Sequence, residues 1–301
     1  MYDTLLVPTD GSEHARRAAE HARYLADAFD ASVHVIAVVD VERATGRFDA
    51  VDAAAASTDR LEADAEAAIE AATDALDGAR PIRTELLRGA PSEVILDYAD
   101  EVGADLLAMG THGRSGVDRY VAGSVTERVV RESPVPVLAV GAGEQSRVDD
   151  GYDEVLLPTD GSDAAAAAVD HGVAVARAVG ARVHAVGVVD ADAVVSRPEF
   201  DPPPEVVAEL QARAERAVDE VTERARAAGL NAVSDVREGV PAEELLAYAE
   251  SAGADLIAMG TAGATGTNRF LLGSTTERVV RNAPVPVLAV NTRDGADGDE
   301  G

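Results

Sequence analysis

Short apolar runs alternate with longer Ala-, Glu- and Arg-rich segments along the whole chain. The apolar runs are bounded by Gly, Pro or Asp and predict buried strands, in the first half at 4–7, 33–39, 82–87, 105–109 and 135–140. The segments between them have helical spacing and predict helices at about 12–29, 58–77, 91–102 and 124–132. Apolar strands that alternate with helices are typical of a parallel sheet covered on both faces. The pattern therefore predicts an α/β fold.

The second half of the chain repeats the first with an offset of 150 residues. LLVPTDGS at 5–12 recurs as VLLPTDGS at 155–162, and 26 of 38 positions are identical between 103–140 and 253–290. Such identity predicts two copies of one domain, which we expect over 1–142 and 152–291. The second copy has apolar runs near 154–157, 183–189, 232–236, 255–259 and 285–290.

Segments without this periodicity predict a linker, a tail and two variable stretches. The linker is 141–152, and the Gly- and Asp-rich tail 292–301 is expected to be disordered. The stretches 40–56 and 190–204 are the least alike between the copies. The proline run at 202–204 predicts the start of a helix.

The amino-acid composition limits how the cores can be built and excludes several kinds of functional site. Apolar residues make up 47% of the chain but aromatics only 3%, so the cores must be built from Val, Leu, Ile and Ala. The absence of Cys excludes disulfides, thiolate nucleophiles and thiolate metal sites. All 26 basic residues are Arg, which excludes a Lys Schiff base and the phosphate-binding Lys of a Walker A loop.

The formal charge of −29 makes nucleic acids and anionic membranes poor partners. No apolar run is long enough to span a membrane and the N-terminus does not resemble a signal peptide, so we expect a cytoplasmic protein. An acid excess with Arg in place of Lys looks like a halophilic protein. At about 1 M salt the Debye length is roughly 3 Å, which screens most of the self-repulsion. The alternative is an ordinary acidic protein.

Most candidate functional residues directly follow two of the predicted strands. Pro8-Thr9-Asp10-Gly11 follows the first strand, and Gly110-Thr111-His112-Gly113 follows the fourth. Open parallel sheets bind ligands beyond the carboxyl ends of their strands, where the strand order reverses. We therefore expect these two strands to be neighbours at that point.

A glycine-rich loop follows the fourth strand in both copies. Gly110 and Gly113 are separated by two residues, Gly113 and Gly123 by nine, and Ser124 opens the next helix. The second copy repeats the spacing with Gly260, Gly263, Gly273 and Ser274. Glycines let the backbone approach a ligand closely, and amides at a helix N-terminus favour an anion such as phosphate.

These glycines, PTDGS after the first strand and PVPVLAV at the last strand together make the chain resemble the universal stress protein family over nearly all of both halves. The resemblance implies two tandem Rossmann-like domains, each with a five-stranded parallel sheet of order 3-2-1-4-5. It implies pairing of the last strands, 135–140 and 285–290, into an intramolecular pseudo-dimer that protects two sheet edges. Further homodimerisation is left open. It also implies bound ATP, or AMP or ADP, with Mg²⁺ or Mn²⁺ carried mainly by the phosphates.

The resemblance further implies the contact residues. Pro8 and Asp10 would line the adenosine side, and the backbone of Val38 would contact adenine. The residues that would surround ribose and phosphates are Met109, Gly110, Gly113, Gly123, Ser124, Val125 and Thr126. Their counterparts in the second copy are Pro158, Asp160, Val188, Met259, Gly260, Gly263, Gly273, Ser274, Thr275 and Thr276. We add to the same clefts Thr9, Thr159, His112 and Arg114.

Structural alternatives exist for most of these residues. Ser124 with Glu127, and Ser274 with Glu277, fit capping boxes. Asp10 and Asp160 fit Asx-turns. Four apolar side chains would be ordinary core residues in any parallel sheet, namely Val38, Val188, Met109 and Met259.

The two copies differ at the loop. His112 and Arg114 become Ala262 and Ala264 in the second copy. Arg114 would reach a phosphate with a charge-assisted bond, so we expect tighter binding in the first copy; alternatively Arg114 is solvated. His14 and His21 lie seven residues apart on one helix and are expected at the surface.

The sequence favours a regulatory stress protein that binds an adenine nucleotide. Phosphoryl transfer needs a positioned base and cationic clamps, and this loop offers Arg but no Lys, so we expect weak ATPase activity at most. The alternatives are a slow adenine-nucleotide hydrolase or transferase, and a nucleotide-free interaction scaffold.

Overall fold

A computed structural model describes residues 1–40, 51–78, 81–113, 124–141, 143, 146, 148, 151–190, 203–262 and 272–291, with only the backbone at 51–57 and 124. The first repeat comprises β1 (Thr4–Pro8), α1 (Glu13–Phe29), β2 (Ser32–Val39), α3 (Val51–Ala75), β3 (Ile82–Arg88), α4 (Pro91–Val102), β4 (Leu106–Gly110), α5 (Ser124–Glu132) and β5 (Val137–Val140). The second comprises β6 (Glu154–Pro158), α6 (Asp163–Val179), β7 (Arg182–Val189), α7 (Pro204–Ala227), β8 (Ala232–Glu238), α8 (Pro241–Ala252), β9 (Leu256–Gly260), α9 (Ser274–Asn282) and β10 (Val287–Val290).

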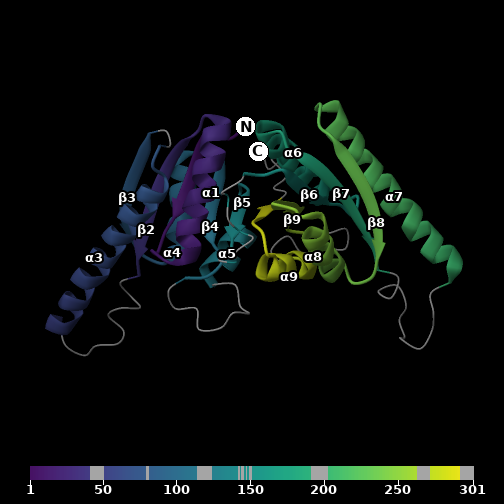
Figure 1. Ribbon diagram of the computed structural model, residues 1–301. Helices are drawn as coiled ribbons and strands as arrows, with labels where there is room; N and C mark the ends of the chain where they lie inside the picture. Colours follow the sequence, from purple (N-terminus) through teal and green to yellow (C-terminus); the bar gives the residue numbers. More distant parts are fainter. Residues whose placement is uncertain are drawn as a thin grey trace, which may run out of the picture.

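All ten strands form one sheet, in the order β3-β2-β1-β4-β5-β10-β9-β6-β7-β8. The strands are parallel within each repeat. The repeats join where β5 and β10 pair antiparallel, with Leu138 opposite Leu288 (Figure 1). The two sheets that the sequence predicts are therefore continuous, and neither last strand is left as an open edge.

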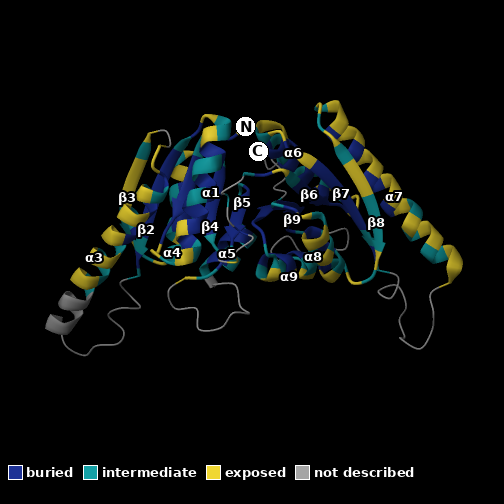
Figure 2. Ribbon diagram, viewed as in Figure 1, coloured by how far each residue is buried: buried dark blue, intermediate teal, exposed yellow. Residues whose placement is uncertain are grey.

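Helices cover both faces of this sheet. On one face a single apolar core runs through both repeats, under α1 and α3 of the first and α6 and α7 of the second, and α1 contacts α6 at the centre. On the other face the cores are separate, one under α4 and α5 and one under α8 and α9. Figure 2 shows the buried inner strands between these layers, the partly exposed edge strands β3 and β8, and the largely exposed outer helices α3 and α7.

Two reciprocal His–Tyr pairs hold the repeats together. The Tyr2 hydroxyl lies 2.7 Å from Nδ1 of His171, and the Tyr152 hydroxyl lies 2.7 Å from Nδ1 of His21. Each pair joins α1 or α6 to the segment just before the first strand of the other repeat. The expectation that His21 is exposed is wrong: its side chain is 1% exposed, because α1 packs against the other repeat.

Gly143 and Ser146 of the linker between the repeats contact α1. Nε2 of His21 lies 2.9 Å from the Ser146 carbonyl, and the Arg17 guanidinium donates to the Gly143 carbonyl. The expected disordered tail, 292–301, falls outside the described residues. No helix in the described ranges is both long and apolar enough to cross a membrane.

Candidate functional site

The two strand ends that carry the motifs lie side by side. β1 and β4 are hydrogen-bonded neighbours, with Leu5 opposite Leu106, and β6 and β9 have the same relation. β2 lies on one side of β1 and β4 on the other, so the strand order reverses between β1 and β4. Pro8 ends β1 and Gly110 ends β4. The motifs therefore meet where open parallel sheets bind ligands.

Asp10 and Asp160 shape the turn from the first strand into the first helix of each repeat. Oδ1 of Asp10 accepts a bond from the Ser12 amide at 3.0 Å, and Oδ1 of Asp160 accepts one from the Ser162 amide at 2.9 Å. These are Asx-turns, so the structural alternative is present in both repeats. Both aspartates are exposed. Their nucleotide contact stays a prediction.

The preceding threonines support the same turns. Each hydroxyl accepts a bond of 3.2 Å from the amide two residues on, Thr9 from Gly11 and Thr159 from Gly161. A side chain at these glycines would be strained because their φ angles are +75° and +74°.

The first glycine of each loop is required by helix packing. A Cβ on Gly110 would lie 2.6 Å from the Cβ of His14, and a Cβ on Gly260 would lie 2.7 Å from the Ala164 carbonyl oxygen. These contacts bring the first turn of α1 or α6 directly against the end of β4 or β9. The first glycine therefore positions the helix and does not by itself indicate a ligand.

The second glycine borders the Asp10 carboxylate. A Cβ on Gly113 would lie 2.5 Å from Oδ2 of Asp10. The loop after β4 and the turn after β1 thus approach closely enough for one ligand to contact both. Arg114, Gly123 and Gly263 fall outside the described residues.

The third glycine begins the helix in the second repeat. The Gly273 amide donates to the Thr261 carbonyl at 2.8 Å, so the two ends of the loop meet. Gly273 is the N-cap of α9, and no side chain in the described part of the chain caps this end. The alternative of a capping box on Ser274 is therefore wrong, because Ser274 is already the first helical residue. Glu277 instead bonds Arg281 at 2.7 Å.

The threonines of the following helix tie it to the strand. The hydroxyls of Thr126 and Thr276 donate to the carbonyls of Gly110 and Gly260, at 2.7 Å each. Both threonines are buried. This bond sets the start of α5 and α9 beside the carboxyl end of β4 and β9.

The remaining expected contacts are divided between core and cleft. Met109 and Met259 are 4% and 5% exposed and belong to the apolar cores. The side chains of Val38 and Val188 are half-buried and pack against the same cores. Their backbones remain the parts that can face a ligand. Val125 packs against the core of the first repeat, while Thr275 is half-buried and Ser274 exposed.

An imidazole pair distinguishes the first repeat. The rings of His14 and His112 lie 5.1 Å apart between centroids, and Nδ1 of His112 lies 3.0 Å from the Thr111 hydroxyl. Nε2 of His112 is buried and has no partner among the described residues. The expectation that His14 is exposed is also wrong, since it is half-buried. Burial and the neighbouring His112 lower the pKa of His14.

The second repeat has Ala164 and Ala262 in place of these histidines. The difference at position 112 stands in the glycine loop and could be predicted to matter, whereas the one at position 14 gains its meaning only from the contact of the two rings. The described residues contain no group of three His, Asp or Glu side chains placed to bind a metal ion.

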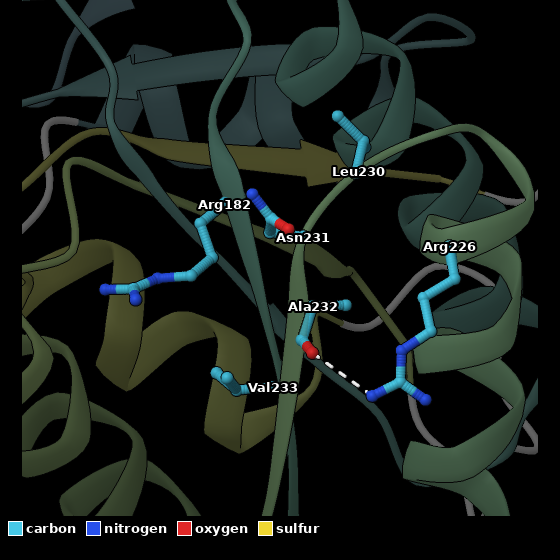
Figure 3. A pocket seen from close by; sticks show the side chains of 6 residues that line it. All are labelled: Arg182, Arg226, Leu230, Asn231, Ala232 and Val233. Carbon is cyan, nitrogen blue, oxygen red and sulfur yellow. Dashed lines mark hydrogen bonds between the residues drawn. The ribbon is translucent and has the colours of Figure 1, made fainter.

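A cavity of about 460 Å³ lies elsewhere, at the starts of β7 and β8 (Figure 3). Arg226 donates to the Ala232 carbonyl at 3.4 Å and Arg182 binds Glu154 at 2.8 Å, so both cations at this cavity are engaged. It is lined by Arg182, Arg226, Leu230, Asn231, Ala232 and Val233. Because strand starts lie at the edge opposite to Pro158 and Gly260, the cavity is separate from the candidate site.

A family model for the universal stress protein family matches residues 1–141 and 151–291. The chain belongs to this family. Universal stress protein MJ0531 of Methanocaldococcus jannaschii is 41% identical over 140 residues, which are 46% of this chain and 82% of that protein.

A solved structure that covers nearly the whole chain shares this fold. A universal stress protein from Archaeoglobus fulgidus has a TM-score of 0.72 at 24% identity, covering 96% of this chain and 98% of that one. A universal stress protein solved in complex with cAMP is 30% identical, with a TM-score of 0.34, over 47% of this chain and 98% of that one.

Proposed function

We propose that each repeat is a domain, over 1–142 and 152–291, that binds an adenine nucleotide, with ATP as the first candidate, and that the protein regulates a stress response. The observation that carries the proposal is the start of α9. Among the described residues, no side chain caps its first-turn amides, and these amides lie beside the end of β9 at the point where the strand order reverses. Membership of the universal stress protein family supports the same proposal.

Main-chain amides suit a phosphate ligand in this chain. With a formal charge of −29 the protein repels a nucleotide at long range. Short N–H bonds at a helix start act at contact distance, and the helix dipole adds to them. These bonds survive high salt better than long-range attraction does.

The residues present fit a nucleotide that lies across two adjoining segments. In the first repeat Gly113 lies so close to the Asp10 carboxylate that one ligand can contact both segments. The adenosine would lie on the side of Pro8, Asp10 and Val38, and the phosphates on the side of the glycine loop. In the second repeat Pro158, Asp160 and Val188 take the same positions.

Mg²⁺ or Mn²⁺ would be carried by the phosphates themselves, because the described residues offer no set of three ligands. Bound in this way, the ion would neutralise phosphate charge near the carboxylates of Asp10 and Asp160. We propose a binding protein with at most slow hydrolysis, since the chain contains no Lys to clamp a transferring phosphoryl group.

Glycine variants test the proposal in the full chain. Gly113→Val would press a side chain against the Asp10 carboxylate and separate the two segments that we expect to contact the nucleotide. Gly263→Val makes the same change at its counterpart by sequence. Isothermal titration with ATP, in about 1 M KCl to screen the surface charge, should give two sites per chain, one site in each single variant and none in the double variant. We expect the tighter site in the first repeat, where His112 and Arg114 replace two alanines.

The control is Gly141→Ala, because a Cβ on Gly141 meets no atom within 4 Å. Thermal unfolding of every variant shows whether it remains folded. ATP, ADP, AMP and cAMP compared in the same titration identify the preferred nucleotide. Absence of binding by the wild-type chain would support an interaction scaffold, and single-turnover hydrolysis near about 1 s⁻¹ would support an enzyme.

A further inference from the structure

The side chain of Asn291, directly after β10, connects the two repeats. Its Oδ1 accepts a hydrogen bond from the Thr261 hydroxyl in the second repeat. Its Nδ2 lies within bonding distance of three carbonyls in the first repeat, at 3.1 Å from Val130, 3.0 Å from Arg131 and 3.1 Å from Ser133. One amide therefore bridges two segments that are far apart in the sequence.

Both segments adjoin a candidate nucleotide site. Thr261 follows Gly260 at the start of the second repeat's loop, and its carbonyl accepts the Gly273 amide that closes this loop at 2.8 Å. Val130 and Arg131 are in the last turn of α5, where backbone carbonyls have no partner within the helix. The other end of α5 is Ser124, where the first repeat's loop ends.

Only the second repeat supplies such a bridging side chain at this position. The counterpart of Asn291 in the first repeat is Gly141, which has no side chain. There the Thr111 hydroxyl lies 3.4 Å from the Val140 carbonyl and 3.0 Å from His112. Near the C-terminal end of α9, the side chain of its own Asn282 donates to the backbone carbonyl of Arg278 at 2.7 Å.

We propose that Asn291 couples the two nucleotide sites, so that a nucleotide in the second repeat strengthens binding in the first. The inference rests on the proposed function. A side-chain amide is planar, so holding Oδ1 on Thr261 fixes the direction in which Nδ2 donates. A ligand in the second loop restricts Thr261, which keeps Asn291 on the end of α5. The firmly capped helix then holds its first-turn amides for the first repeat's ligand.

The coupling is measured with a mutant cycle in the full chain. ATP affinity at the first site is determined with the second site intact and with it blocked by Gly263→Val. Blocking should weaken the first site by roughly fivefold or more, within the usual range of coupling between sites. In Asn291→Gly, which installs the residue that the first repeat has naturally, blocking should change nothing. Thr261→Val removes the hydroxyl at nearly constant shape and should give the same result.

Asn282→Ala is the matched control, because it removes an Asn that bonds within one repeat only. Coupling should persist in this variant. Hydrogen exchange without nucleotide provides a second readout: amides of α5 should lose protection in Asn291→Gly and Thr261→Val, but not in Asn282→Ala.

The outcomes separate the two proposals. If neither site binds a nucleotide, the proposed function fails, and the coupling fails with it. If both sites bind but blocking the second leaves the first unchanged in the wild-type chain, only the coupling is overturned. Coupling that persists in Asn291→Gly would also overturn it, because another path would then carry the effect.

Discussion

His21 uses both ring nitrogens to join the two halves of the molecule. Nδ1 contacts the Tyr152 hydroxyl and Nε2 contacts the Ser146 carbonyl. Burial lowers the pKa of His21 from 6.5 to about 4, with a smaller contribution from Arg17. A proton on this ring would be taken up without water around it and beside a cation. The neutral ring is therefore part of the folded state.

His21 should make the protein less stable in mild acid. The unfolded chain binds a proton near pH 6.5, whereas the folded chain resists it until about pH 4. Stability is thus fully present above pH 6.5 and falls as the pH drops toward 4, by roughly 3 kcal/mol for this group. His21→Gln keeps polar atoms in the site but does not titrate.

Denaturant unfolding of both proteins at pH 7, 5.5 and 4 tests this prediction, at one salt concentration. Protonation of carboxylates changes the free energy of unfolding of both proteins alike. The test therefore uses the difference in this free energy between the two proteins. The advantage of the wild-type chain over His21→Gln should shrink as the pH falls. A difference that stays constant over this range would contradict the buried neutral imidazole.

At the scale of elements, close approach of a helix to a strand end fixes the geometry of the site. Gly260 lies against the first turn of α6, with no room for a Cβ beside the Ala164 backbone. We expect Gly260→Ala to lower the free energy of unfolding by about 1–3 kcal/mol, because the helix must shift. Gly141→Ala, in open space, should be neutral or slightly stabilising. Chemical denaturation measures both, and equal stabilities would show that the contact relaxes without cost.

Most elements could be predicted because apolar runs indicate most strands and because the same pattern recurs in both repeats. α3 begins at Val51, earlier than the predicted 58, because the run Ala53-Ala54-Ala55-Ala56 favours a helix without giving any amphipathic periodicity. The cap of α9 was missed for another reason. Ser-x-x-Glu fits a capping box, but local sequence cannot show that Gly273 is held by Thr261, which shifts the helix start by one residue.

Contacts between residues far apart in the sequence were the least predictable part of the site. The pairing of β5 with β10 was expected from the family resemblance. By contrast, Asn291 contacts Arg131 of the other repeat, 160 residues away, and His14 contacts His112 of its own repeat, 98 residues away. Such contacts depend on how the elements are arranged in space, and no local pattern encodes that arrangement.

The whole molecule carries its charge on the outside of one continuous sheet. Acidic residues number 55 and basic residues 26. The outer helices α3 and α7 are largely exposed at the two ends of the sheet (Figure 2). Folding brings their carboxylates closer together than in the unfolded chain, so unscreened self-repulsion opposes folding.

Salt should therefore stabilise the folded chain over a wide range. The Debye length falls from about 10 Å at 0.1 M to about 3 Å at 1 M salt, so most of the gain should come within that interval. Thermal unfolding in increasing KCl should show a rising Tm. Glu66→Gln with Glu70→Gln, which removes two exposed carboxylates from α3, should raise the Tm at low salt and leave it nearly unchanged at high salt. A variant that shifts the Tm equally at all salt concentrations would show that preferential hydration, and not charge screening, underlies the stabilisation.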